Sequence, residues 1–264
     1  MSDDRDFVEA LARGLDVIRA FSTSHLSLSV SDVAQQTGLA RPTARRLLLT
    51  LEAIGYVRSH NGEYSLTPKV LELGMSYINA QGMWDVARPH LQSLVEATRE
   101  SSSMSQLDGS DIVYTARVPV PKIIGISVQI GTKFPAVATS MGQVLLSDLS
   151  ESELDRVLKT PSNSEVIPRL KPSRKDLVAL LADARKRGWA LSDEQLALGI
   201  RSIAAPVRDA SGRTVAAVNV TVHAAETSIA VLKKEHLPKL LATAAAISED
   251  FARLSQLPST KPLR

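Results

Sequence analysis

The sequence predicts an α+β protein of two domains, an N-terminal winged helix-turn-helix and a larger domain that mixes strands and helices. Its 264 residues suit two domains better than one small module. Apolar residues recur at helical spacing up to about residue 54, and Asn61-Gly62 between two β-rich runs then signals a hairpin. From residue 103 onward β-rich runs alternate with helical stretches, without a βαβ rhythm or a phosphate-binding glycine loop.

Three helices are expected before the hairpin. The first covers residues 7–22, whose apolar side chains recur three or four positions apart: Val8, Leu11, Leu15, Ile18 and Phe21. The second opens behind Ser29, which forms a capping-box pattern with Asp32, and it ends at Gly38. The third begins at Pro42, whose fixed φ and missing N–H suit a first helical turn.

The second and third helices fit a helix-turn-helix. Gly38 has no Cβ and so permits the left-handed turn between them. Small and apolar residues stand where the two helices should touch: Ala34, Leu39, Ala44 and Leu47, with Leu48, Leu51 and Ile54 also expected to face inward. In such units the later helix of the pair, here the third helix of the sequence, enters the major groove of DNA, and its first residues lie at the base edges.

The residues expected to contact DNA gather at the start of the third helix and at the hairpin tip: Arg41, Thr43, Arg45, Arg46, His60 and Asn61. The first 67 residues hold seven Lys and Arg against eight Asp and Glu, so their net charge is slightly negative. Attraction to DNA must therefore come from the local placement of these arginines. A cationic helix that packs in a protein-interaction module is the alternative. Arginines clustered at one helix end beside a hairpin favour double-stranded DNA.

Residues 68–82 are predicted to form a linker helix, with Leu71, Met75 and Ile78 along one side. This side is a candidate dimer contact, and packing against its own domain is the alternative. Helix-turn-helix proteins usually bind two half-sites as dimers, so we expect a homodimer or a dimer of dimers on a palindromic or pseudo-palindromic operator. The predicted domains are then 1–67, the linker 68–82, an effector domain at 83–254 and a flexible tail at 255–264.

For the C-terminal half we expect strands at 111–118, 123–131, 202–208 and 214–223. Helices are expected at 84–99, 142–149, 151–159, 173–187 and 235–254. Hydrophobic residues make up 44% of the chain and charged residues 22%, which is ordinary globular usage, so a core can form without disulfides or metals.

Several classes of function find no support in the sequence. Cysteine is absent, which removes disulfides, thiolate zinc sites and cysteine nucleophiles. No GxSxG, Walker, GxGxxG or HExxH motif occurs, so we expect no enzyme, no cofactor and no metal. Scattered Ser, His and Asp could still converge, and a domain that only oligomerises is a further alternative. With no signal-peptide pattern and no run of 18 apolar residues, we expect a cytoplasmic protein without a membrane partner.

Three segments of the sequence, together with its closing helix, resemble the isocitrate lyase regulator (IclR) family of bacterial transcription factors. The three segments read SVSDVAQQTGLARPTARRLLLTLEAIGYV, RVPVPKIIGISVQIGTKFPAVATSMGQVLL and DEQLALGIRSIAAPVRDASGRTVAAVNVTVH. The runs at 139–142 and 219–223 are most similar to the branch that controls protocatechuate, 4-hydroxybenzoate and β-ketoadipate catabolism. The resemblance implies a GAF-like C-terminal domain, with a curved antiparallel sheet, flanking helices and a pocket for a small organic-acid effector.

The resemblance also implies which residues line that pocket: Ser140, Met141, Gly142, Asp193, Ser202, Asn219, Thr221 and His223. Thr139 or Ser140 can cap the helix that follows, whose free N–H groups favour a carboxylate; an ordinary cap without a ligand is the alternative. Asn219, Thr221 and His223 alternate along one strand and share one face, toward either the pocket or solvent.

Positive charge for an acidic effector is harder to place. Arg117 and Arg201 could neutralise an acid, or each could form a structural ion pair. Relatives in the aromatic-catabolism branch often carry Arg after Ser-Met-Gly, whereas this sequence has Gln143. A neutral amide cannot supply the charge. This departure argues against the expectation that this protein and those relatives bind the same dicarboxylate.

Overall fold

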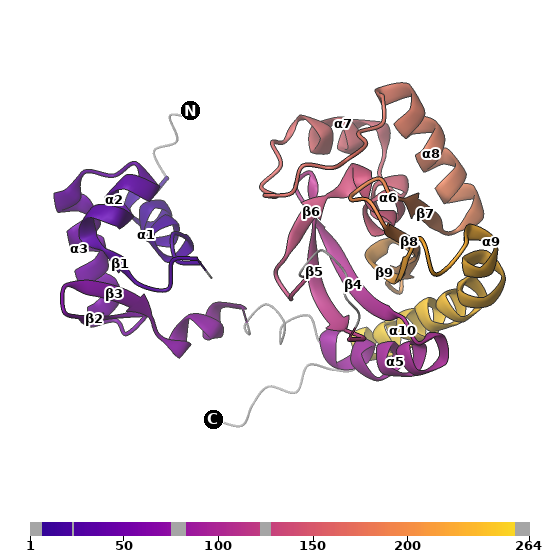
Figure 1. Cartoon of the computed structure of the whole chain (residues 1–264), viewed down its shortest axis with the longest axis horizontal. Helices are drawn as coiled ribbons and strands as arrows, with labels where there is room; N and C mark the ends of the chain where they lie inside the picture. Colours follow the sequence, from indigo (N-terminus) through magenta and orange to yellow (C-terminus); the bar gives the residue numbers. More distant parts are fainter. Residues whose placement is uncertain (1–6, 23, 75–82, 122–127, 257–264) are drawn as a thin grey trace. The chain divides into compact units, whose positions relative to one another are not determined.

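The computed structural model describes residues 7–22, 24–74, 83–121 and 128–256. The chain divides into two compact units, Met1–Ala80 and Gln81–Arg264, which we call the N-terminal and C-terminal domains (Figure 1). None of the described helices is long and apolar enough to cross a membrane.

The N-terminal domain is a winged helix-turn-helix, as the sequence predicts. Its elements are α1 (Glu9–Arg19), β1 (Leu28–Ser29), α2 (Val30–Thr37), α3 (Arg41–Ala53), β2 (Val57–His60) and β3 (Glu63–Leu66). The strands form an antiparallel sheet in the order β1-β3-β2, and the β2–β3 hairpin is the wing.

The signals that delimit α2 act as expected. The Ser29 hydroxyl accepts a hydrogen bond from the Asp32 N–H, and the Asp32 carboxylate accepts one from the Ser29 N–H at 2.9 Å. Hydrogen bonds from Ser29 lower the pKa of Asp32. At the other end, Gly38 has φ +67°, in the left-handed region, and its N–H donates to the Ala34 carbonyl. Capping and turn thus fix the approach of α2 to α3.

The core of this domain contains Val17, Val33, Ala44, Leu48 and Leu51, together with side chains of the wing. The predicted apolar side of the first helix is wrong in its N-terminal half, since Val8, Leu11 and Leu15 are exposed. Only the C-terminal half of α1, with Val17, Ile18 and the following Phe21, packs on the core. Ile54, also expected inside, is the residue that ends α3 and is 49% exposed.

The predicted linker helix lies partly outside the described residues. It begins as a 3-10 turn, η1 (Pro68–Val70), and residues 71–74 are helical. Leu71 is exposed, while Met75 and Ile78 fall among residues that the structure does not describe.

The C-terminal domain is built on a six-stranded antiparallel sheet in the order β6-β5-β4-β9-β8-β7. The strands are β4 (Ser101–Asp108), β5 (Asp111–Val118), β6 (Lys133–Pro135), β7 (Ala190–Asp193), β8 (Ile200–Arg208) and β9 (Thr214–His223). The helices are α5 (Met83–Thr98), η2 (Ala136–Ala138), α6 (Ser140–Ser147), α7 (Glu151–Lys159), α8 (Arg174–Arg187), α9 (Ile229–Val231) and α10 (Leu237–Gln256).

Helices cover both faces of this sheet (Figure 1). α5 and α10 pack together on one face, around a core that includes Leu91, Ile203, Val218 and Leu240. η2, α6 and α8 cover the other face, around Ile112, Phe134, Met141 and Leu181. The antiparallel α+β domain implied by the family resemblance is therefore confirmed.

In the C-terminal domain three strands, β4, β6 and β7, are not expected from the sequence, and one expected strand differs from the structure. The sequence of β4, SSSMSQLD, contains none of the β-branched or aromatic residues that favour strands. β4 forms because it pairs with β5 on one side and β9 on the other. The expected strand at 123–131 lies partly outside the described residues. Its described end, 128–131, is a turn region rather than a strand, with the Gly131 N–H donating to the Tyr114 carbonyl.

Candidate functional site

The start of α3 presents an exposed cationic surface. Arg41, Arg45 and Arg46 are exposed, while Thr43 is half-buried. Among the described residues, none of the three guanidinium groups has a carboxylate partner or a side-chain hydrogen bond. Three unpaired arginines on the first turns of one helix can bond phosphates or the guanine edge.

The backbone at this helix end is open as well. The residue before α3 is Ala40, which carries no side-chain oxygen to cap the helix, in contrast to Ser29 before α2. The first N–H groups of a helix have no partner within it, and they favour an anion such as phosphate. The uncapped end and the arginines therefore lie at the same place.

The wing of the same domain carries the other predicted contact residues. Its turn uses Asn61 at φ +52° and Gly62 at φ +83°, both in the left-handed region that a two-residue hairpin needs. The exposed His60 and Asn61 side chains contact each other, with Nε2 and Nδ2 3.2 Å apart. Arg58 on β2 is also exposed, and its Nε donates to the Ser65 hydroxyl at 3.2 Å. Arg58 was not among the predicted contact residues, although it belongs to the same arginine-rich stretch.

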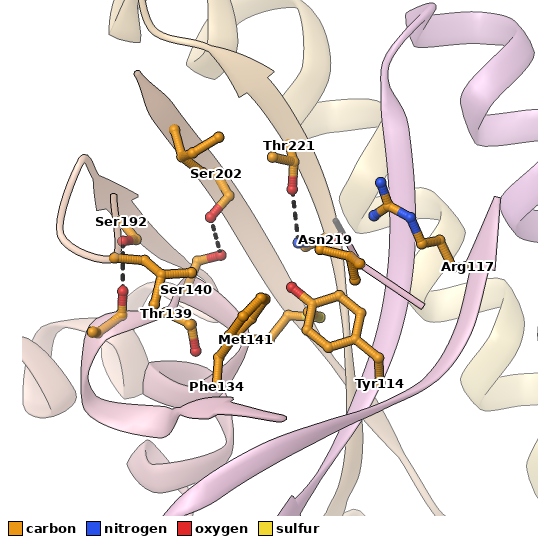
Figure 2. A pocket seen from close by; sticks show the side chains of 14 residues that line it. Tyr114, Arg117, Phe134, Thr139, Ser140, Met141, Ser192, Ser202, Asn219 and Thr221 are labelled. Atoms are coloured by element: carbon orange, nitrogen blue, oxygen red, sulfur yellow. Dashed lines mark hydrogen bonds between the residues drawn. The ribbon is translucent and has the colours of Figure 1, made fainter. Parts of the chain in front are cut away.

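The C-terminal domain holds a pocket between the sheet and the η2–α6 segment (Figure 2). It encloses about 550 Å³ between its lining atoms, including its mouth. The lining comes from five strands and the segments beside them: Tyr114, Arg117, Val128, Phe134, Ala138, Thr139, Ser140, Met141, Ser192, Leu196, Ile200, Ser202, Asn219 and Thr221.

One end of the pocket carries hydroxyl groups, as Figure 2 shows. The hydroxyls of Ser140 and Ser202 are 2.8 Å apart, and the Ser192 hydroxyl donates to the Ala138 carbonyl at 3.0 Å. Thr139 is the residue that caps α6, since its Oγ1 accepts the Gly142 N–H at 3.1 Å. All of these groups are neutral.

The opposite end carries Arg117, with Asn219 and Thr221 beside it (Figure 2). The Arg117 guanidinium donates to the Ser103 hydroxyl at 3.0 Å, and burial lowers its pKa. The Asn219 side chain is held at both ends: its Oδ1 accepts the Ser103 N–H, and its Nδ2 donates to Thr221 Oγ1, each at 3.0 Å. The sheet therefore fixes this polar end in place.

Between the two ends the walls are apolar and aromatic. The rings of Tyr114 and Phe134 meet edge to face, with centroids 5.5 Å apart and an interplanar angle of 85°. Burial raises the pKa of Tyr114 to about 12, so its hydroxyl stays neutral and can donate. Met141 adds a polarizable wall and accepts from the Ser105 hydroxyl through sulfur at 3.3 Å.

Five of the eight predicted pocket residues line this pocket: Ser140, Met141, Ser202, Asn219 and Thr221. Asn219 is 3% exposed, so this side of β9 faces the pocket rather than solvent.

The other three predicted residues, Gly142, Asp193 and His223, are not among the residues that line this pocket. Gly142 packs against the backbone of Ala136. The Asp193 carboxylate pairs with the Arg201 guanidinium, Oδ1 to Nε at 2.6 Å, and His223 Nδ1 accepts the Ala225 N–H at 3.3 Å.

The two open questions about positive charge have separate answers. Arg201 is structural, because it also donates to the carbonyls of Ala224 and Thr227, whereas Arg117 reaches the pocket. Gln143 does not line the pocket. Its buried amide donates to Gln195 Oε1 at 2.7 Å and to the Val137 carbonyl, and so links α6 to the loop after β7.

Two family models match the chain in order. Residues 10–60 match the IclR helix-turn-helix domain, and residues 75–249 match the bacterial transcriptional regulator IclR C-terminal domain. The chain belongs to the IclR family. The family resemblance stated from the sequence is therefore confirmed, and this IclR-family protein is a transcriptional regulator that binds double-stranded DNA.

Individual relatives agree with this assignment. The IclR-family chain is 36% identical over 240 residues to the Pca regulon regulatory protein of Pseudomonas putida, covering 90% of this chain and 82% of the relative. A crystal structure of a candidate transcriptional regulator from Rhodococcus sp. RHA1 is 46% identical, with a TM-score of 0.81, covering 94% of this chain and all of that one. An IclR homologue from Microbacterium hydrocarbonoxydans, solved in complex with 4-hydroxybenzoate, shares the fold with a TM-score of 0.78 at 22% identity, covering 93% and 99%.

Proposed function

We propose that this IclR-family regulator controls catabolism of an aromatic or related organic acid, and that the acid binds in the pocket of the C-terminal domain. The observation that carries the proposal is the pocket itself. It has hydroxyl groups at one end, an arginine at the other and aromatic walls between them. The relative named for the Pca regulon and the homologue bound to 4-hydroxybenzoate support the choice of ligand class.

The effector changes DNA binding by shifting the protein between two arrangements. Only a difference in effector affinity between them can do so, and such couplings are typically about 1–3 kcal/mol. In this scheme the C-terminal domain binds the effector without catalysing a reaction. The protein acts in the cytoplasm, where its DNA is.

Calorimetric titration of the intact protein with aromatic acids tests the effector role. We expect saturable heat of binding and recovery of the acid unchanged. Turnover of the acid would support an enzyme instead, and silence across a broad panel of acids would support a domain that only oligomerises.

We propose that Arg41, Thr43, Arg45 and Arg46 contact the operator from α3, with His60 and Asn61 on the wing. Replacing Arg46 by alanine is expected to weaken operator binding by about 5- to 150-fold, since one base or phosphate contact of arginine contributes ~1–3 kcal/mol. Fluorescence anisotropy with a labelled operator fragment at fixed salt measures the change.

Arg19→Ala is the matched control for Arg46→Ala. Arg19 is an exposed arginine of α1, 3.9 Å from Asp16, and it lies outside the proposed contact set. The Arg19→Ala variant should therefore bind the operator with an affinity within about twofold of wild type. Equal affinities for Arg46→Ala and wild type, with effector binding intact in both, would contradict the placement of α3 in the groove.

We propose that the protein binds a palindromic or pseudo-palindromic operator as a homodimer or a dimer of dimers. Two half-sites related by symmetry require two copies of α3. Sedimentation equilibrium at micromolar concentration should therefore give a mass of two or four chains. A single-chain mass across that range would remove the symmetric operator from the proposal.

A further inference from the structure

The pocket of the C-terminal domain carries charge at one end only. Among its described lining residues, Arg117 is the one side chain that is charged near neutral pH, because the Tyr114 hydroxyl stays protonated. Within the described part of the chain no carboxylate lies within ion-pair distance of Arg117, and its side-chain partner is the neutral Ser103 hydroxyl. A half-buried guanidinium without a counter-ion is poorly solvated, so an anion bound beside it is strongly favoured.

The far end of the pocket offers neutral hydrogen-bonding groups. The Ser140 and Ser202 hydroxyls are paired at 2.8 Å, and each can donate or accept when a third polar group arrives. Gln143 is buried and bonded to Gln195, so it adds no donor to the lining. This end suits a hydroxyl group better than a second carboxylate.

The walls between the two ends are aromatic and apolar. Phe134 and Tyr114 stand nearly perpendicular to each other, and Met141 lies beside them in Figure 2, between the serine hydroxyls and Arg117. Aromatic rings pack edge to face or offset against such walls. The hydroxyl of Tyr114 has no hydrogen-bond partner among the described residues, and it is therefore available to a ligand.

We propose that the pocket selects aromatic monocarboxylates in one orientation, with the carboxylate on Arg117 and the neutral polar substituent at the Ser140–Ser202 pair. This inference rests on the proposed function, which puts the effector in this pocket, and it adds the charge of the ligand and its direction. The opposite orientation would place the carboxylate at the start of α6 and leave Arg117 without a counter-ion.

The test compares ligands that differ by one group. Calorimetry on the intact protein uses 4-hydroxybenzoate, its neutral analogue 4-hydroxybenzamide, benzoate, and the dicarboxylate terephthalate. Wild type is expected to bind 4-hydroxybenzoate about 10- to 100-fold more tightly than the amide, as charge-assisted hydrogen bonds allow. In Arg117→Gln that ratio should fall to near one. In Ser202→Ala the ratio should persist, while the preference for 4-hydroxybenzoate over benzoate falls about fivefold or more.

Two further variants separate charge recognition from loss of fold. Arg117→Lys keeps the charge without the planar fork and should give an intermediate ratio, which keeps the test decisive if Arg117→Gln does not fold. Arg201→Gln removes the structural arginine beside Asp193 and should leave the ratio at the wild-type value.

The outcomes distinguish the inference from the function beneath it. A wild-type ratio in Arg117→Gln, or terephthalate binding as tightly as 4-hydroxybenzoate, overturns the inference while leaving the pocket an effector site. Failure of all four compounds to bind wild type overturns the aromatic-acid effector and the inference together.

Discussion

Replacing Gly142 by alanine is expected to lower the free energy of unfolding of the C-terminal domain by about 3 kcal/mol or more. A Cβ at this position would lie 2.1 Å from the Ala136 carbonyl oxygen and 2.4 Å from its Cα. Overpacking usually costs ~1–3 kcal/mol, and the contact here is with backbone, which cannot rotate away. α6 would have to move from η2, and the pocket wall formed by Thr139, Ser140 and Met141 would move with it.

Tryptophan fluorescence during chemical denaturation measures this change selectively. The chain has two tryptophans, Trp84 and Trp189, and both lie in the C-terminal domain, so the signal reports that domain alone. Gly14→Ala is the contrasting substitution. Nothing lies within 4 Å of a Cβ at Gly14 in α1, and alanine is the better helix former by ~1 kcal/mol. It should therefore slightly stabilise the N-terminal domain. An unchanged fluorescence midpoint in Gly142→Ala would show that the close contact of α6 with η2 is not required.

Replacing Leu48 by alanine is expected to lower the free energy of unfolding of the N-terminal domain by ~2–5 kcal/mol. Leu48 is fully buried on α3, in the core formed with α1, α2 and the wing. Whole domains are stable by only ~5–15 kcal/mol, so this loss would leave a measurable unfolded fraction and weaken operator binding. The far-UV circular dichroism transition of the N-terminal domain should shift, while the tryptophan transition stays in place.

Leu49→Ala is the matched control, because it makes the same chemical change one residue further along α3. Leu49 is 39% exposed, so its truncation leaves little cavity and should cost well under half as much as Leu48→Ala. Equal shifts for the two variants would contradict the orientation of α3 on its core.

The winged helix-turn-helix could be predicted from the sequence because its signals are local. Ser29 and Asp32 cap α2, Gly38 makes the left-handed turn, and Asn61-Gly62 closes the wing, and each acts within a few residues. The orientation of α1 was harder to predict. Its apolar spacing is helical, but the rest of the fold leaves the N-terminal half of that side uncovered.

The pocket was less predictable, since bulges and pairings between distant segments build it. β5 shows why. Tyr114 pairs with Ser105 and Ala116 with Met104, which leaves Thr115 as an extra residue in the ladder. This bulge reverses the alternation, so Tyr114 and Arg117 both reach the pocket while Ala116 packs on the other face. Strict alternation would put Arg117 on the face opposite Tyr114.

Ion pairs between strands could not be predicted from the sequence either. Asp193 and Arg201 face each other only because β7 and β8 pair in register. In this pairing the Asp193 carboxylate is bound to the Arg201 guanidinium. The sequence names both residues but contains nothing that joins them.

The missing cap before α3 has a consequence for the energetics of operator release. Amides held by Ser29 and Asp32 at α2 are protected from exchange with solvent, whereas the first turn behind Ala40 depends on acceptors from outside the chain. A phosphate oxygen of the duplex can supply such an acceptor in place of water, so this contact forms without breaking a hydrogen bond inside the protein. On release, water can take the same positions again, so operator dissociation leaves no polar group of this helix end without a partner.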